Sequence, residues 1–183
     1  GLGTMAFTMQ DVLLEPYGGE ILKLSVSSTT LLTATLALGG LIGFGWASRV
    51  ISRGADPYRM ASWGAWIGLP AFVLIILAAP LMSVNLFVLG VFLIGLGGGL
   101  FAHGTLTASM NLAPPDQTGL AMGAWGAVQA TASGLGMALG GLLRDGVAQL
   151  SDSVTGYSAV YGIEVVMLIL TLMAMKPLLR KSN

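Results

Sequence analysis

Charged residues are missing from two long stretches of the chain, and this restricts the fold more than any other feature. No Asp, Glu, Lys or Arg occurs between Lys23 and Arg49, or between Arg59 and Asp116. A helix needs about 20 predominantly apolar residues to cross the hydrocarbon core of a membrane. Only 9% of the 183 residues are charged, against about 25% in soluble domains. We therefore expect an all-α integral membrane protein in contact with lipid.

Charges and helix-breaking residues divide the sequence into six expected transmembrane helices. The first ends at Glu15-Pro16-Tyr17-Gly18-Gly19, where proline and paired glycines predict a stop. Pro80 and Asn85 break the longest apolar stretch. The expected spans are 1–14, 27–47, 60–79, 86–112, 119–143 and 157–175. They predict a single six-helix bundle over 1–183, whose first helix is too short to cross alone and is expected to begin upstream.

The distribution of basic residues predicts the orientation of the bundle. The loop after the second span and the C-terminal tail hold Arg49, Arg53, Arg59, Lys176, Arg180 and Lys181. The opposite loops hold only Lys23 and Arg144, so both ends of the set are expected to be cytoplasmic. Aromatic residues fit interfacial anchoring: Trp46, Trp63, Trp66 and Trp125 near the cytoplasmic ends, and Tyr17, Tyr157 and Tyr161 near the other face.

Glycines recur at four-residue spacing in four of the expected helices. The pairs are Gly39/Gly43, Gly95/Gly99, Gly119/Gly123 and Gly136/Gly140. Small residues at this spacing allow a neighbouring helix to approach closely. We expect them to pack the bundle; the alternative is that some receive a flat hydrophobic ligand or a helix of another protein.

Ionisable and polar groups inside a membrane are costly and therefore need an explanation. Asp11 and Glu15 are four residues apart, and they predict a structural or docking role near the interface, or a proton relay. Glu164 is expected to pair with Arg144 across an antiparallel hairpin. Gln129 and Ser133 share a helical face with Trp125, which predicts an interhelical hydrogen-bond ladder or a cavity lining.

His103 is the only histidine, and a neutral imidazole can ligate the metal of a tetrapyrrole. Gly99 and Gly104 are small enough to leave room for a flat macrocycle beside it. The alternative is a structural histidine that is hydrogen-bonded to Thr107 or to a neighbouring helix.

Several function classes are excluded by what the sequence lacks. The absence of cysteine excludes disulfides and thiolate metal sites. The net charge of zero provides no basic field for nucleic acid. No phosphate-binding loop, HExxH metal motif, serine triad or haem-attachment motif is present. We expect no catalytic residue, no metal site and no enzymatic activity.

Two segments resemble a known family. Residues 10–19, QDVLLEPYGG, and residues 113–130, APPDQTGLAMGAWGAVQA, are similar to the second half of the bacteriochlorophyll delivery proteins. These are the PucC/LhaA-type members of the major facilitator superfamily. Gly45, Arg49, Arg53, Gly54 and Arg59 resemble the superfamily's loop motif G-x-x-x-D-R-x-G-R-R, but the acidic residue of the motif is missing.

The resemblance implies the C-terminal half of a twelve-helix facilitator fold, with the N-terminal half of the same fold as a partner. It also implies assembly of the light-harvesting antenna in the photosynthetic inner (intracytoplasmic) membrane of bacteria, by binding or delivering bacteriochlorophyll or antenna polypeptides. On this view His103 is the candidate pigment ligand. The alternatives are a proton-coupled secondary transporter using Asp11, Glu15 or Glu164, and a structural subunit bound to a photosynthetic or reaction-centre antenna complex.

Overall fold

Helices are the only regular secondary structure in the part of the chain that the computed structural model describes, residues 1–181. The side chains of Arg180 and Lys181, two residues of the predicted basic tail, lie outside the described part. The elements in order are α1 (Leu2–Thr8), α2 (Leu14–Glu20), α3 (Val26–Ile51), α4 (Pro57–Ala78), α5 (Val84–Leu112), the 3₁₀ turn η1 (Pro115–Gln117), α6 (Thr118–Leu150) and α7 (Ser153–Lys181).

Of the helices in residues 1–181, four are long and apolar enough to cross a membrane: α3, α4, α5 and α7. The sequence predicted six spans, so the count is confirmed only in part. α6 has 33 residues, but many of them are glycine, alanine, serine or threonine, and its apolar content is correspondingly lower. The first predicted span, 1–14, contains only the seven-residue α1 followed by turns, and α2, also of seven residues, begins at its last residue.

The first segment breaks earlier than the sequence analysis predicted. Residues 9–13 form turns, and α2 then runs through Pro16 instead of stopping there. A proline ring clashes with the carbonyl group four residues before it and lacks an N–H, so proline fits only the first turn of a helix. Pro16 is the third residue of α2, and a continuous helix through residue 12 is therefore unfavourable.

Polar side chains mark the start of the three central helices. Ser25 accepts a hydrogen bond from the backbone N–H of Ser28 at 3.3 Å, and Ser83 accepts one from Leu86 at 3.4 Å. Asp56 accepts from Tyr58 at 3.0 Å and precedes Pro57 at the first position of α4. These caps satisfy N–H groups that have no partner within the helix. The predicted break near Pro80 and Asn85 is confirmed, because α4 ends at Ala78 and α5 begins at Val84.

Glycines bring the backbone of α5 against both α3 and α4. A Cβ atom on Gly95 or Gly99 would collide with backbone atoms of α3, and one on Gly104 would lie 2.7 Å from the Pro57 carbonyl oxygen in α4. On the facing helix, Gly39 and Gly43 meet the backbone of α5. Helix packing, the expected role of these glycines, is confirmed for the Gly39/Gly43 and Gly95/Gly99 pairs. Gly136 of α6 similarly meets α1, and Gly140 meets Met9, the residue after α1. Among the described residues nothing lies within 4 Å of a Cβ added at Gly119 or Gly123.

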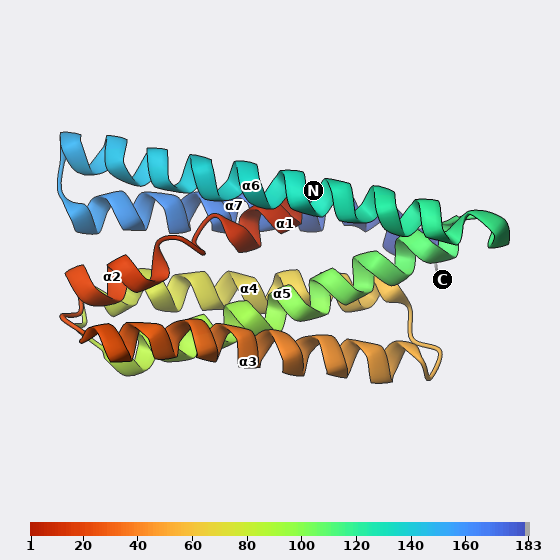
Figure 1. Ribbon diagram of the computed structural model, residues 1–183, viewed down its shortest axis with the longest axis horizontal. Coiled ribbons are helices and arrows are strands. Elements are labelled where there is room, and N and C mark those ends of the chain that lie inside the picture. Colours follow the sequence, from red (N-terminus) through yellow and green to blue (C-terminus); the bar gives the residue numbers. More distant parts are fainter. Residues whose placement is uncertain (182–183) are drawn as a thin grey trace.

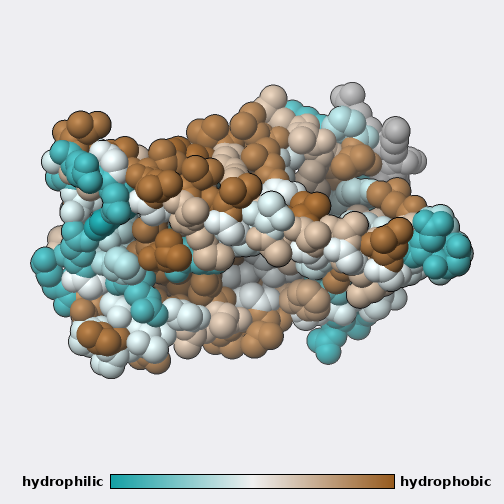
Figure 2. Space-filling model, turned by 45° about the horizontal axis from the view of Figure 1, so that its top comes forward, coloured by the Kyte–Doolittle hydropathy of each residue, from teal (hydrophilic) through white to brown (hydrophobic). Residues whose placement is uncertain are grey.

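The helices form two groups that lie side by side along the long axis (Figure 1). One contains α6, α7 and α1, and the other contains α2, α3, α4 and α5. The α3–α4 and α5–α6 connections lie at one end of the bundle, with the described C-terminal end. Figure 2 shows hydrophobic side chains over much of the middle of one face, with hydrophilic residues gathered at the two ends, as a membrane-spanning bundle requires.

Three tyrosines that were predicted to be interfacial anchors are instead buried. Tyr17, Tyr157 and Tyr161 are each 0% exposed. The Tyr17 hydroxyl donates to the Ile75 carbonyl oxygen at 2.9 Å, and its ring makes edge contacts with Tyr157 and Tyr161 at centroid distances of 5.1 and 5.8 Å. The tyrosines therefore join α2 to α7 inside the bundle. Of the four tryptophans predicted as anchors at the cytoplasmic ends, Trp46, Trp63 and Trp66 are 52–61% exposed, whereas Trp125 is half-buried and donates a hydrogen bond to Thr105.

Candidate functional site

A cavity of about 340 Å³ lies between α1, α3, α5 and α6. We call it the central cavity. One part of its wall is apolar or small, and the other part carries polar side chains from α1, the α1–α2 link and α6. The apolar and small residues are Phe7, Leu36, Gly40, Ile94, Gly95, Gly98, Gly99, Phe101 and Ala102, and the polar ones are Thr4, Thr8, Asp11, Gln129 and Ser133.

Hydrogen bonds within α1 and between α1 and α6 hold the polar part of the wall. The Thr4 hydroxyl of α1 donates to Gln129 Oε1 of α6, and the Thr8 hydroxyl donates to the Thr4 carbonyl oxygen at 2.9 Å. Trp125 Nε1 donates to the Thr105 hydroxyl of α5 at 3.2 Å. Gln129 thus both lines the cavity and bonds across helices, and Ser133 lines the cavity. This face of α6 therefore provides both the interhelical hydrogen bonds, from Gln129 and Trp125, and the cavity lining, from Gln129 and Ser133.

A second cavity of about 410 Å³ adjoins the central cavity along α5 and α6 and shares Phe101 and Gln129 with it. Thr105, Ser109 and Trp125 also line it. A third, almost wholly apolar cavity of about 510 Å³ lies on α1 and α6 and includes Leu2, Met5 and Leu135. The surface beside α1, α5 and α6 is therefore hollowed over several helical turns. An apolar hollow with a few placed polar groups is typical of a binding site.

The structure does not give His103 the surroundings that the sequence predicted. Gly99 packs on the backbone of Gly40 and Phe44 in α3, and Gly104 packs on Pro57 and Ala61 in α4. These two glycines therefore do not leave room for a macrocycle beside His103, because neighbouring helices occupy that space. The imidazole makes an edge contact with Phe44 at a centroid distance of 4.4 Å. Its buried Nδ1 has no hydrogen-bond partner among the described residues.

Asp11 and Glu15 are not on one continuous helical face, because the α1–α2 break separates them. Asp11 lies in the link, lines the central cavity and accepts a hydrogen bond from Gln10 Nε2 at 2.7 Å. Glu15 lies in the first turn of α2 and accepts from the Thr33 hydroxyl of α3 at 2.7 Å. Of the two, only Asp11 belongs to the central cavity.

The predicted pairing of Glu164 with Arg144 is wrong. Arg144 forms ion pairs with Glu20 of α2 and with the adjacent Asp145, and it donates to the Tyr157 hydroxyl at 2.9 Å. A hydrogen bond from Ser153, together with the Tyr157 hydroxyl and the Arg144 charge, holds the pKa of Glu20 below its usual value. This cluster ties α2 to the α6–α7 turn at one end of the bundle. Glu164 lies deeper and is 0% exposed.

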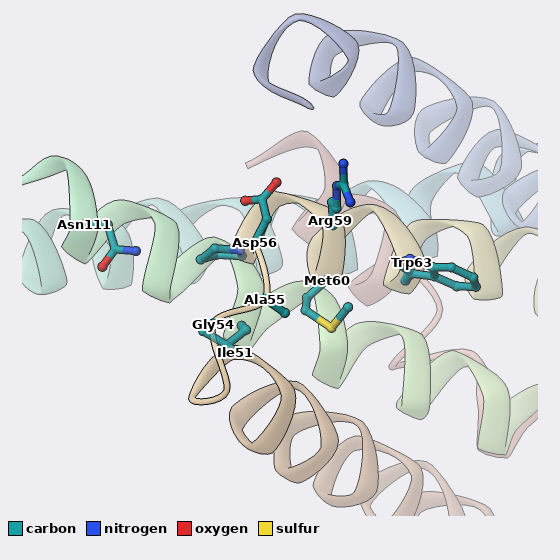
Figure 3. Close-up of a pocket in the computed structure, with 9 residues that line it drawn as sticks. Ile51, Gly54, Ala55, Asp56, Arg59, Met60, Trp63 and Asn111 are labelled. Carbon is teal, nitrogen blue, oxygen red and sulfur yellow. The ribbon is translucent and has the colours of Figure 1, made fainter. Parts of the chain in front are cut away.

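A larger cavity of about 840 Å³ lies at the α3–α4 loop, in the segment that resembles the facilitator loop motif (Figure 3). Asp56 and Arg59 extend from the start of α4, and Asn111 comes from the last turn of α5. The lining also includes Gly54, Met60 and Trp63. This cavity is at the end of the bundle that carries the basic loop, whereas the central cavity is beside its apolar middle.

Some residues of the central cavity were missed by the sequence analysis. Thr4 and Thr8 complete a polar series with Asp11 and Glu15 at spacings of four, three and four residues. That spacing marks one side of a helix and was the available signal. The residues around Thr4 and Thr8 are apolar or small, so the two threonines did not stand out from a membrane-spanning pattern. Gln10, next to Asp11, was not singled out from the sequence either, and its side chain is 0% exposed.

Comparison with known proteins gives a consistent result. The sequence profile of the family described as "PUCC protein" matches residues 1–183. "Protein PucC" of Rhodovulum sulfidophilum is 60% identical over 80% of this chain and 32% of the relative, and "Protein PucC" of Cereibacter sphaeroides is 53% identical over 100% of this chain and 41% of the relative. The "Bacteriochlorophyll synthase 44.5 kDa chain" of Rhodobacter capsulatus is 27% identical over 94% of this chain and 41% of the relative. The chain therefore spans less than half the length of these relatives. Because the profile match extends over all its residues, the chain belongs to the PUCC protein family.

Proposed function

We propose that this chain acts in the assembly of the photosynthetic light-harvesting antenna, by holding a membrane-embedded antenna component against α1, α5 and α6. The observation that carries the proposal is the central cavity, which is apolar on one part of its wall and hydrogen-bonded on the other. An antenna helix or its bacteriochlorophyll would bring an apolar body with a few polar groups. Membership of the PUCC protein family supports this choice of ligand over other apolar ligands.

The proposed arrangement in the membrane has six crossings and resembles half of a facilitator fold. α6 lies beside α7 along much of its length (Figure 1), so a membrane that contains α7 also contains most of α6. α1 and α2 together form part of a discontinuous crossing, from the middle of the bundle to one end (Figure 1), and such a break is tolerated where it is buried in protein or lines a cavity. The connections that carry Arg49, Arg53 and Arg59 would face the cytoplasm of the bacterial inner membrane, with the C-terminal end on the same side.

The second half of the proposed facilitator fold would lie against α6. Gly119, Gly123 and Gly126 on this helix have no neighbouring atom within 4 Å of an added Cβ. This glycine-rich surface can accept a closely packed helix. The relatives are more than twice as long as the aligned region, which leaves enough chain for such a half.

Ligation of bacteriochlorophyll by His103 is a further part of the proposal. The free Nδ1 atom among the described residues supports it, but the covered Gly99 and Gly104 do not provide the cradle. When bound, the pigment would supply its absorption and its central metal. The contribution of this chain would be the imidazole nitrogen and the Phe44 edge contact, reached from a side other than the two glycines.

A near-infrared absorption spectrum of the tagged full-length protein, purified gently from its native membranes, tests the proposed function. We expect a bacteriochlorophyll band that persists through washing, carried by the protein or by a bound antenna polypeptide. His103→Ala should weaken the band if the imidazole holds the pigment directly and leave it intact if an antenna polypeptide carries it. A preparation with neither pigment nor antenna polypeptide, from cells that are making antenna, would contradict the proposal.

A further inference from the structure

The described residues contain a group of buried polar side chains without hydrogen-bond partners at the α1–α2 break. Gln10, Tyr161 and Glu164 are each 0% exposed. Gln10 Oε1, the Tyr161 hydroxyl and both carboxyl oxygens of Glu164 have no partner among the described residues. The backbone N–H of Gln10 lies near the Glu164 carboxyl group, but it does not make a hydrogen bond of good geometry with either oxygen. Buried polar atoms are nearly always satisfied, so these unpartnered atoms need an explanation.

The charges around Glu164 determine which protonation state of its carboxyl group is favoured. From the α1–α2 link, Asp11 interacts electrostatically with Glu164, and on α7 itself Tyr161 does so. The residues of α4 that pack on this part of α7 are uncharged: Gly68 lies next to Leu168, and the Phe72 ring lies next to the Tyr161 ring. Neither α4 beyond Arg59 nor α6 before Arg144 contains an ionisable residue. Arg144 is occupied by Glu20, Asp145 and Tyr157.

An ionised Glu164 would thus be a buried anion facing a second carboxyl group. Burial without a compensating cation favours the neutral acid, and two nearby carboxyl groups do not both ionise readily. The neutral acid is a donor as well as an acceptor. It can therefore donate a hydrogen bond to an unpartnered oxygen at the break while it accepts one from the Tyr161 hydroxyl.

We propose that Glu164 is a buried proton-binding site, with Gln10 and Tyr161 as positioning residues and Asp11 as the group that exchanges the proton with the central cavity. In the exchange step the Glu164 acid loses its proton to the Asp11 carboxylate. The products are the Glu164 carboxylate and the Asp11 acid, and Asp11 then releases the proton into the cavity that it lines. The proton on Glu164 stabilises the packing of α7 against the break, and its loss leaves a buried charge that loosens this packing. The inference is independent of which antenna component the cavity holds.

Infrared difference spectroscopy of the purified full-length protein tests the proton site. We expect a carboxylic-acid C=O band near neutral pH that shifts in D₂O, is missing in Glu164→Gln and is retained in Asp116→Asn, which removes an exposed carboxyl group of η1. Tyr161→Phe should keep the band but move its frequency, because one hydrogen bond to the acid is lost. Asp11→Asn should keep the band but slow its decay after a jump to alkaline pH.

Thermal unfolding supplies a second readout with a defined sign. At neutral pH the folded protein holds the proton, whereas a glutamate in the unfolded chain has already lost it, so the stability from this site falls as pH rises. Wild type should lose melting temperature toward alkaline pH, whereas Glu164→Gln should lose less. Identical infrared spectra for wild type and Glu164→Gln would overturn the proposal, as would carboxylate bands that respond to Na⁺ instead of pH. If Glu164→Gln does not fold, an unshifted band in Tyr161→Phe would overturn it.

Discussion

Gly43→Ala is expected to destabilise the bundle, whereas Gly45→Ala, two residues away on the same helix, is expected not to. A Cβ atom on Gly43 would collide with the Leu96 carbonyl oxygen and lie 3.2 Å from the Leu100 nitrogen, so α3 and α5 would have to separate. Overpacking of this kind costs about 1–3 kcal/mol. Nothing lies within 4 Å of the same atom on Gly45, where alanine instead favours the helix by about 0.5–1 kcal/mol.

Thermal unfolding of the purified variants in one detergent measures this difference. In a chain of this size, about 1 kcal/mol corresponds to roughly 2–4 °C. Gly43→Ala should therefore melt several degrees below wild type, and Gly45→Ala should melt at or slightly above it. Equal melting temperatures for the two variants would show that α3 and α5 do not cross where the structure places them.

Ser133→Phe is expected to abolish most antenna assembly without unfolding the protein. Ser133 lines the central cavity from α6 and is only partly buried, so a phenyl ring there projects into the cavity and leaves the helix intact. A steric block that costs the ligand about 1.4 kcal/mol lowers its affinity tenfold. The matched control is Ala138→Phe, an exposed position of α6 that does not line this cavity.

Both variants would replace the native protein in a phototroph that depends on it, and antenna absorption would be compared at equal amounts of variant protein. We expect about a tenfold or greater loss for Ser133→Phe and near wild-type absorption for Ala138→Phe. Normal antenna with Ser133→Phe would show that the central cavity is not where the antenna component binds.

The elements that could be predicted from sequence are those set by local composition. Charge-free stretches of sufficient length become α3, α4 and α5, and the apolar stretch around Glu164 becomes α7, because lipid admits no other ordinary structure for them. Gly39/Gly43 and Gly95/Gly99 predicted close helix crossings, because small residues at four-residue spacing let two backbones approach. Pro16 was harder, because a proline is compatible with both the end of one helix and the first turn of the next. Its position in α2 depends on the packing of Tyr17 against α4 and α5.

The partners of the polar residues could not be predicted, because they come from helices distant in sequence. Glu20, 124 residues before Arg144, is the residue that pairs with it, and this contact depends on where the broken first segment lies. Likewise, the cavity role of Gln129 depends on Thr4, 125 residues away. The sequence identified Asp11, Gln129 and Glu164 as unusual for a membrane helix, and the tertiary fold assigns them to the cavity and to the buried group behind it.

Photo-crosslinking from the cavity wall, in living cells that are making antenna, tests whether the central cavity holds an antenna component. A photoreactive amino acid at position 133 would be compared with the same residue at position 138. We expect a covalent adduct with an antenna polypeptide or with bacteriochlorophyll from position 133, and much less adduct from position 138. Equal adducts from both positions, or no antenna adduct from position 133 in cells with normal antenna, would contradict it.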